Sequence, residues 1–457
     1  MTSDYRDVVV FLPGIGGSSL VREGRPIWGG SWRAMANAIV RGGLRDLALP
    51  EGDEEDGVSV GGLVDDVQII PGLWKIEAYG AFCSSLVATV GLVEGENFFR
   101  FPYDWRHDVR VTARRLETCV ADWLARWKTL SGNDQARVVL VAHSMGGLVS
   151  RYYVECLEGW KTTRRLVSLG TPYRGSLNAL GFLVNGYSRG IGPLRVDATA
   201  PLRTFTSVYQ LLPTYPCVEV AGEMLRVPDA GLPHVDHRST DAMTFHQEMT
   251  VAAQANLRID GYSADYLSCL VSSRQPTYQS ARPTSKGVDL IETIGGESAG
   301  GDGTVPSPSA VPVGVDRGAA TYAWGLHSAL ANQEAVREHV LEGLRAGRID
   351  EDRYRKGEHG GRQIRLRLDD VYTAGQAFEL SAELADQSEQ TLLAIAEPVS
   401  GGEARQTVLH REGGRYVGPL VLTEGAWRIS VSGRRSDKVH DVVMALPANG
   451  EVGVDHS

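Results

Sequence analysis

Three side chains that are far apart in this 457-residue chain could together perform nucleophilic catalysis: Ser144, Asp302 and His327. A serine hydroxyl is a weak nucleophile until a base removes its proton, and the base works best when an acid orients it. Ser144 lies in the stretch AHSMG (142–146), which matches the pattern Gly-x-Ser-x-Gly except that Ala142 takes the first glycine position. Alanine adds only a methyl group there, so we predict that Ser144 is the nucleophile.

The elements expected on either side of Ser144 support this prediction. Residues 138–141 are apolar and rich in valine, which predicts a strand, and residues 148–157 predict a helix. A strand, a tight turn of small residues and a helix form the setting in which a nucleophilic serine sits on a strained turn. A chance turn of small residues is the alternative, and the matching flanks disfavour it.

Chain order selects the base and the acid. In folds with such a turn, the acid follows the serine and the histidine follows the acid. Of the eleven histidines, His327 lies in a short loop before a helix expected over residues 329–346, where a base is normally presented. Asp302 stands between two glycines, which alone would indicate only a turn. Together with Ser144 and His327, its role as the acid is the better interpretation.

A glycine-rich loop, PGIGGSS (13–19), follows a strand expected over residues 8–12. Glycines let the backbone turn tightly and expose its N–H groups, which suits a phosphate cradle or an oxyanion hole. No Gly-Lys-Ser/Thr follows, which argues against a phosphate-binding loop. We therefore expect the backbone N–H groups of Ile15 and Met145 to form an oxyanion hole. A plain glycine-rich turn remains the alternative.

The order of the expected elements predicts the fold class. Helices expected over residues 79–90 and 109–130 alternate with strands, which indicates a parallel sheet covered by helices on both faces. With the serine on its turn, this is the pattern of an α/β-hydrolase. Residues 174–297 depart from the alternation and are predicted to form a cap or lid insertion that carries the substrate pocket.

The C-terminal part of the chain predicts a second unit. We expect a catalytic domain over residues 1–346, a polar linker over residues 347–361 and a separate module over residues 362–457. The module contains short alternating stretches divided by Gly, Asp and Pro, which predicts a small antiparallel β-sandwich. It contains no recognisable catalytic residues, and whether it binds a protein partner is left open.

Composition limits the classes of function. The formal net charge of −10 argues against nucleic-acid binding. Five widely spaced cysteines predict neither a disulfide framework nor a metal site, and we expect no cofactor. The chain has no apolar window of 18 residues and no secretory signal, so we expect a cytoplasmic protein.

The segment before the first predicted helix carries an acidic run and three tryptophans. The run, residues 51–56, is expected to be a solvated loop. Trp28, Trp32 and Trp74 flank it, and they predict either partly buried core residues or a surface for transient contact with a membrane.

Taken together and in order, seven pieces resemble the lecithin:cholesterol acyltransferase family, which includes lysosomal phospholipase A2 and the phospholipid:diacylglycerol acyltransferases. The resemblance covers roughly residues 8–345. The pieces are PGIGGS (13–18), FPYDWR (101–106), AHSMGG (142–147), LGTPYRGS (169–176), QLLP (210–213), GDGTVP (301–306) and the His327 loop.

This resemblance implies a capped α/β-hydrolase that forms an acyl-serine from an ester lipid and passes the acyl group to an alcohol or to water. It assigns the triad and the oxyanion amides to the same positions: Ser144, Asp302, His327, Ile15 and Met145. It also implies that Asp104 and Arg106 form a buried ion pair that braces the site. The secreted mammalian members have a signal peptide and an early cysteine pair, whereas no cysteine precedes Cys83 here.

These observations predict a serine-dependent lipid esterase or O-acyltransferase whose substrate is an acyl ester. A hydrolase or thioesterase for a non-lipid ester is the first alternative. A hydrolase-fold binding module with a silent site is the second. The choice between water and an alcohol as acyl acceptor is left open.

Overall fold

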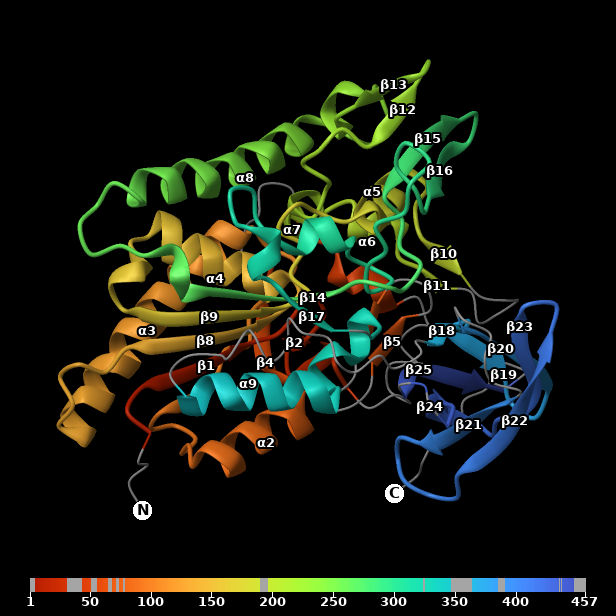
Figure 1. Ribbon diagram of the computed structural model, residues 1–457. Helices are drawn as coiled ribbons and strands as arrows, with labels where there is room; N and C mark the ends of the chain where they lie inside the picture. The colour runs from red at the N-terminus through yellow and green to blue at the C-terminus, as the bar shows by residue number, and fades with distance from the viewer. Residues whose placement is uncertain are drawn as a thin grey trace.

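The computed structural model shows a catalytic domain with a six-stranded sheet at its centre and a second sheet from the C-terminal part of the chain (Figure 1). The predicted linker and Trp32 lie outside the described residues. The described residues are 5–30, 43–50, 56–64, 68–70, 74–76, 79–189, 196–323, 325–346, 364–384, 391–434, 436 and 438–447.

The central sheet has the strand order β17-β14-β9-β8-β1-β7, and every neighbouring pair is parallel. Strands β1 and β8 are buried along their whole length, because helices cover both faces and leave no strand side for polar residues. The strands predicted over residues 8–12 and 138–141 are confirmed. The strands are β1 (Val8–Leu12), β7 (Phe98–Arg100), β8 (Val138–His143), β9 (Thr163–Leu169), β14 (Leu267–Ser272) and β17 (Thr321–Ala323).

Helices lie on both faces of this sheet, as the alternation predicted. Figure 1 shows α3 (Val109–Ser131) and α4 (Met145–Cys156) on one side, with α2 (Gly80–Val90) and α9 (Glu334–Ala346) on the other. The long helix α8 (His237–Asn256) packs on α4. The apolar residues of α3 recur at helical spacing and are buried, which explains why this segment is a helix.

The cap differs from its predicted range, because β14 falls inside residues 174–297 but pairs with β9 and β17 in the central sheet. Its sequence, LSCLVS, is a short apolar run that periodicity cannot distinguish from a buried helical segment. The cap is therefore built from segments on both sides of β14, and strands from the two segments join in one sheet, β13-β12-β15-β16. Its elements are α5 (Leu177–Val184), β10 (Ser188–Arg189), β11 (Val196–Asp197), α6 (Thr199–Leu202), α7 (Thr206–Gln210), β12 (Val218–Val220), β13 (Glu223–Leu225), β15 (Ser280–Thr284) and β16 (Gly287–Ile291).

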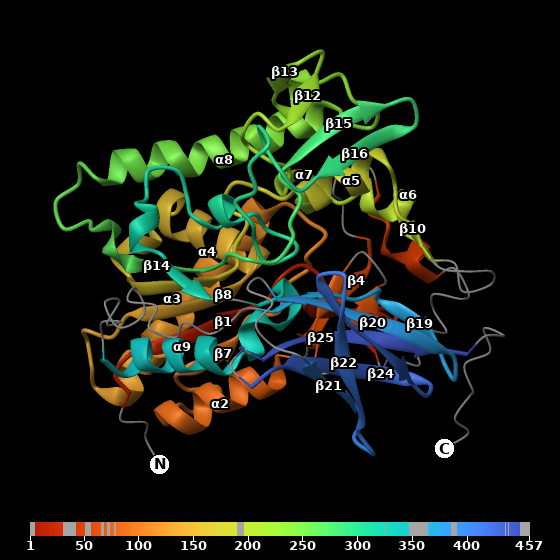
Figure 2. The same cartoon turned by 45° about the vertical axis from the view of Figure 1, so that its right-hand side comes forward.

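The C-terminal module is a curled, mainly antiparallel sheet that lies beside the catalytic domain (Figure 2). The predicted antiparallel β-module is confirmed, but its eight strands pair continuously as one curled sheet instead of forming two separate sheets. Their order is β18-β20-β23-β22-β21-β24-β25-β19. Alternation of polar and apolar residues indicates which side chains face inward, but it does not indicate which strands pair. The sequence pattern therefore does not predict the strand order of this module. The strands are β18 (Ile364–Arg367), β19 (Val371–Thr373), β20 (Ala377–Leu384), β21 (Thr391–Pro398), β22 (Arg405–Glu412), β23 (Arg415–Val421), β24 (Gly425–Ser432) and β25 (Val439–Leu446).

Among the described residues no helix is long and apolar enough to cross a membrane. Shorter elements complete the described chain. Two small sheets, β3-β2-β4 and β5-β6, precede α2. Their strands are β2 (Ser18–Arg22), β3 (Arg25–Trp28), β4 (Val58–Leu63), β5 (Gln68–Ile70) and β6 (Trp74–Ile76). The 3-10 helices are η1 (Gly43–Leu47), η2 (Gly159–Lys161), η4 (Val227–Asp229), η5 (Ala264–Tyr266), η6 (Ser307–Ala310), η7 (Arg317–Ala319) and η8 (His327–Asn332).

Arg106 forms a buried cluster of ion pairs. Its side chain is fully buried, and its guanidinium lies 2.6 Å from an Asp104 carboxylate oxygen and 2.8 Å from one of Asp56. It also donates to the backbone oxygen of Leu47 at 3.0 Å. Burial alone would raise the pKa of Asp104, but hydrogen bonds from His107 and Arg106 outweigh burial and lower it. The expectation that the acidic run is solvated is wrong for Asp56, because this carboxylate pairs with a buried guanidinium.

Replacing Arg106 should destabilise the protein strongly. Arg106→Met leaves two carboxylates without their buried cation, so we expect the free energy of unfolding to fall by about 3–5 kcal/mol. Arg282→Met is the matched control, because its ion pair with Glu219 is exposed and should contribute little. Urea unfolding followed by fluorescence measures both variants, and equal midpoints for the two would contradict the prediction.

Candidate active site

Ser144 lies at the turn between β8 and α4 in a strained backbone conformation, with φ 53° and ψ −126°. The turn requires small neighbours. A Cβ atom on Gly146 would lie 2.6 Å from the backbone oxygen of Pro13, and one on Gly147 would overlap the hydroxyl of Thr171. These close approaches explain the two glycines after Met145 in the motif, and they pack the start of α4 against the chain that follows β1 and β9.

The structure brings the three predicted triad residues together. The Oγ atom of Ser144 lies 2.9 Å from Nε2 of His327, and Nδ1 of His327 lies 2.6 Å from Oδ2 of Asp302. Asp302 is 1% exposed, and its other oxygen accepts the N–H groups of Thr304 at 2.9 Å and Val305 at 2.6 Å. In this arrangement Nε2 of His327 can accept the proton of the Ser144 hydroxyl. The fixed carboxylate of Asp302 meanwhile faces Nδ1 on the other side of the ring.

The glycine-rich loop after β1 lies directly against Ser144. A Cβ atom on Gly14 would be 2.9 Å from Cβ of Ser144. The N–H of Gly14 donates to the hydroxyl of Tyr79 at 3.2 Å, so this amide is engaged. Among the described residues, neither Ile15 nor Met145 shows a hydrogen bond from its backbone N–H. Both amides thus remain candidates for the oxyanion hole, and that role stays a prediction.

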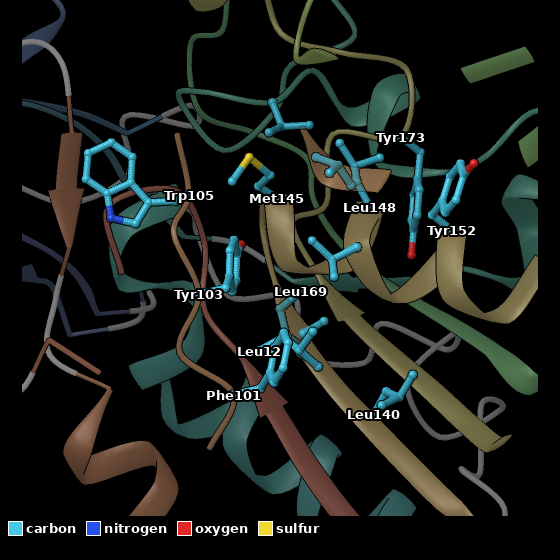
Figure 3. Close-up of a cluster of buried hydrophobic side chains, with 14 of the residues drawn as sticks. Leu12, Phe101, Tyr103, Trp105, Leu140, Met145, Leu148, Tyr152, Leu169 and Tyr173 are labelled. Atoms are coloured by element: carbon cyan, nitrogen blue, oxygen red, sulfur yellow. The ribbon is translucent and has the colours of Figure 1, made fainter. Parts of the chain in front are cut away.

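Aromatic side chains hold this loop in place. The hydroxyl of Tyr103 donates to the backbone oxygen of Pro13 at 2.8 Å, and the indole N–H of Trp105 donates to that of Ser18 at 3.0 Å. Figure 3 shows Tyr103 and Trp105 in the cluster of buried side chains that also contains Leu12 and Met145. The FPYDWR piece therefore holds the loop through its aromatic residues, whereas its ion pair joins Arg106 to Asp56 and to the backbone of Leu47.

Trp28 belongs to the same cluster. Its side chain is buried, its indole N–H donates to the backbone oxygen of Gly16 at 2.5 Å, and its ring packs edge-on against Trp105. The prediction that these tryptophans are core residues is therefore confirmed for Trp28. A membrane-contacting role is wrong for this residue, and the side chains of Trp32 and Trp74 lie outside the described residues.

His143 lies in the site although the sequence motifs did not predict a role for it. Its Nε2 lies 3.0 Å from the backbone oxygen of His327, and its Nδ1 lies 2.8 Å from the hydroxyl of Tyr79. A carbonyl only accepts, so Nε2 carries the proton and Nδ1 accepts from the tyrosine. Burial, followed by the neighbouring His327, lowers the pKa of His143 to about 3. The one available signal was its position directly before the nucleophile.

A cavity of about 680 Å³ opens onto Ser144 and His327. This volume is within the range of pockets that bind small molecules. The cap supplies apolar side chains to it, among them Phe182, Val208 and Leu211, and the C-terminal sheet lines another side. Among the described residues, no group of three or more His, Cys, Asp or Glu side chains could hold a metal ion.

The parallel sheet, the strained serine at the end of β8 and the cap define the catalytic domain as an α/β-hydrolase. The structure is similar to a chain in the crystal structure of the Tle4–Tli4 complex, with a TM-score of 0.51 and 15% sequence identity. The match covers 75% of this chain and 98% of that chain, and at this identity it shows the fold alone.

Residues 73–265 match the family model described as lecithin:cholesterol acyltransferase, so the resemblance predicted from the motifs is confirmed. The chain is 27% identical to a putative phospholipid:diacylglycerol acyltransferase 2 of Arabidopsis thaliana, over 42% of this chain and 33% of that protein. It is 30% identical to the lysosomal phospholipase A and acyltransferase of Homo sapiens, over 29% of this chain and 33% of that protein. The matches thus span about one third of the length of these relatives.

Three buried histidines should make the folded state sensitive to acid. Burial lowers the pKa of His143 to about 3 and the pKa values of His246 and His339 to about 4, whereas an exposed histidine has a pKa near 6.5. Below about pH 6.5 the unfolded chain binds protons that the folded chain does not, so stability should fall from there towards pH 3–4. Urea midpoints measured between pH 8 and pH 4.5 test this.

A matched pair of variants isolates the effect. His246→Gln removes one buried titrating group and should flatten the fall of the urea midpoint with acid. His237→Gln removes an exposed histidine and should leave the slope unchanged. If the urea midpoint falls with acid equally steeply in both variants, His246 does not contribute to the acid sensitivity of the folded state.

Proposed function

We propose that this protein is a serine esterase or O-acyltransferase that acts on an acyl-ester lipid through an acyl-serine intermediate. The observation that carries the proposal is the hydrogen-bonded chain from Ser144 through His327 to Asp302, which faces a cavity with an apolar side. The names of the relatives, a phospholipase and acyltransferases, agree with it.

In the first half of the proposed reaction, Nε2 of His327 accepts the proton of Ser144, and Oγ attacks the carbonyl carbon of the ester. The tetrahedral oxyanion receives hydrogen bonds from the amides of Ile15 and Met145. Such a donor contributes about 3–4 kcal/mol to the transition state. His327 then gives its proton to the leaving alcohol, and the acyl group stays on Ser144. Asp302 stabilises the imidazolium that forms between these steps.

In the second half, His327 removes a proton from water or from an acceptor alcohol, whose oxygen attacks the acyl-serine carbonyl. The same two amides stabilise the second oxyanion, and the proton returns to Ser144. Water gives a free fatty acid, whereas an alcohol gives a new ester. The cap controls how much water reaches the acyl-serine, and this access sets the ratio of hydrolysis to acyl transfer.

The cavity lining supports a lipid acyl group. Phe182 on α5, Val208 on α7 and Leu211, which directly follows α7, offer an apolar wall beside the serine. Burying a methylene group contributes about 0.8 kcal/mol, so a long acyl chain would gain affinity along such a wall. Contact with a membrane surface would bring the lipid to the cavity. That contact and a cytoplasmic setting stay predictions.

Removing the nucleophile should abolish the chemistry without unfolding the protein. Ser144→Ala should lose both ester cleavage and labelling by a fluorophosphonate, because no other hydroxyl lies within 2.9 Å of His327 Nε2 in the described site. Ser168→Ala removes a buried hydroxyl on β9 and is the matched control, which should keep both. Labelling of Ser144→Ala at the wild-type rate would refute the assignment, and no labelling of the wild type would favour a silent binding module.

Product analysis separates the candidate reactions. Incubation with mixed phospholipids and a long-chain alcohol should yield fatty acid, an alkyl ester or both, detected by mass spectrometry and absent with Ser144→Ala. Cleavage should increase when the substrate passes into micelles. Activity on short soluble esters with no gain from micelles would instead favour the non-lipid hydrolase or thioesterase.

A further inference from the structure

The C-terminal sheet contacts the loop that carries His327, and Asp441 on β25 makes the contact. Asp441 is 4% exposed, and its Oδ1 accepts a hydrogen bond from the hydroxyl of Ser328 at 3.1 Å. The same oxygen accepts the backbone N–H of Val442 at 2.9 Å, which orients the carboxylate. Ser328 follows His327 directly, so this hydrogen bond holds the residue beside the base.

The His327 loop is restrained at several other atoms. The N–H of His327 donates to the backbone oxygen of Asp302 at 2.8 Å, and its carbonyl accepts from His143 at 3.0 Å. The N–H of Gly325 donates to the hydroxyl of Ser272 at 3.1 Å. These restraints fix the backbone before and at His327. The contact from Asp441 adds a restraint immediately after it, where the loop enters η8.

The C-terminal sheet also forms part of the wall of the catalytic cavity. Leu368, Tyr372 and Asp441 line the cavity that contains Ser144 and His327. Figure 2 shows this sheet lying against the catalytic domain below the cap. The module therefore lies within the site, close to the residues that perform the chemistry.

We infer that Asp441 is a positioning residue, which acts through Ser328 to hold His327 in line with the nucleophile. The inference rests on the proposed role of Ser144 and extends the catalytic apparatus to the C-terminal sheet. Its physical basis is the steep dependence of catalysis on geometry. A displacement of about 1 Å in a reacting group can lower the rate by as much as about 10²-fold.

Variants at the two partners test the inference. In assays with p-nitrophenyl butyrate, Asp441→Ala and Ser328→Ala should each lower kcat by about 10-fold and leave KM nearly unchanged, because the loss concerns the transition state. Their double variant should be no slower than either single one, since the two side chains act through one hydrogen bond. Asp441→Asn keeps an acceptor oxygen for Ser328 and should restore most of kcat.

A control variant separates positioning from stability. Ser430→Ala on the neighbouring β24 removes a buried hydroxyl that donates to the backbone oxygen of Ile395 at 3.3 Å. It should lower the urea midpoint without lowering kcat. Two results would overturn the inference. One is a fall in kcat of Ser430→Ala equal to that of Asp441→Ala. The other is an Asp441→Asn variant as slow as Asp441→Ala.

The rate of fluorophosphonate labelling keeps this test apart from the proposed function. A labelled wild type and an Asp441→Ala variant that labels several-fold more slowly support the positioning role, whichever ester is the substrate. If both proteins label equally fast, the positioning role fails while the nucleophile assignment stands. If the wild type does not label at all, the proposed function fails, and the inference fails with it.

Discussion

The close approach of two loops at the carboxyl ends of β1 and β8 is the constraint on which the site depends. The parallel register that pairs Leu12 with Ala142 brings the glycine-rich loop next to Ser144. Gly14 and Gly146 allow this approach because a side chain at either position would collide with the opposite loop. The strained backbone of Ser144 persists because the surrounding packing leaves it no other conformation.

Around this junction, polar groups are buried with defined partners. Tyr79 binds the loop amide of Gly14 and the ring of His143, and His143 in turn binds the carbonyl of His327. A neutral His143 can fill this position because it donates through one nitrogen and accepts through the other. The glycine-rich loop and His327 are thus connected by one chain of hydrogen bonds that does not pass through Ser144.

The cap and the C-terminal sheet complete the site from two sides. The cap contributes apolar side chains from α5 and α7, whereas the C-terminal sheet contributes Tyr372 and Asp441. The sequence indicated no chemistry in the C-terminal residues. Their relevance comes from where they lie, since an aspartate on β25 reaches the residue next to His327.

The sequence by itself determined the local features: the strand, small-residue turn and helix around Ser144, the chain order of the triad residues and the parallel α/β architecture. These depend on periodicity and on residue size, which neighbours in the chain reveal. Tertiary structure alone decided that β14 joins the central sheet, that Asp56 pairs with Arg106 and that β25 contacts the His327 loop. Each of these is a pairing between distant segments, and hydrophobic pattern specifies only that a segment is buried, not the partner against which it packs.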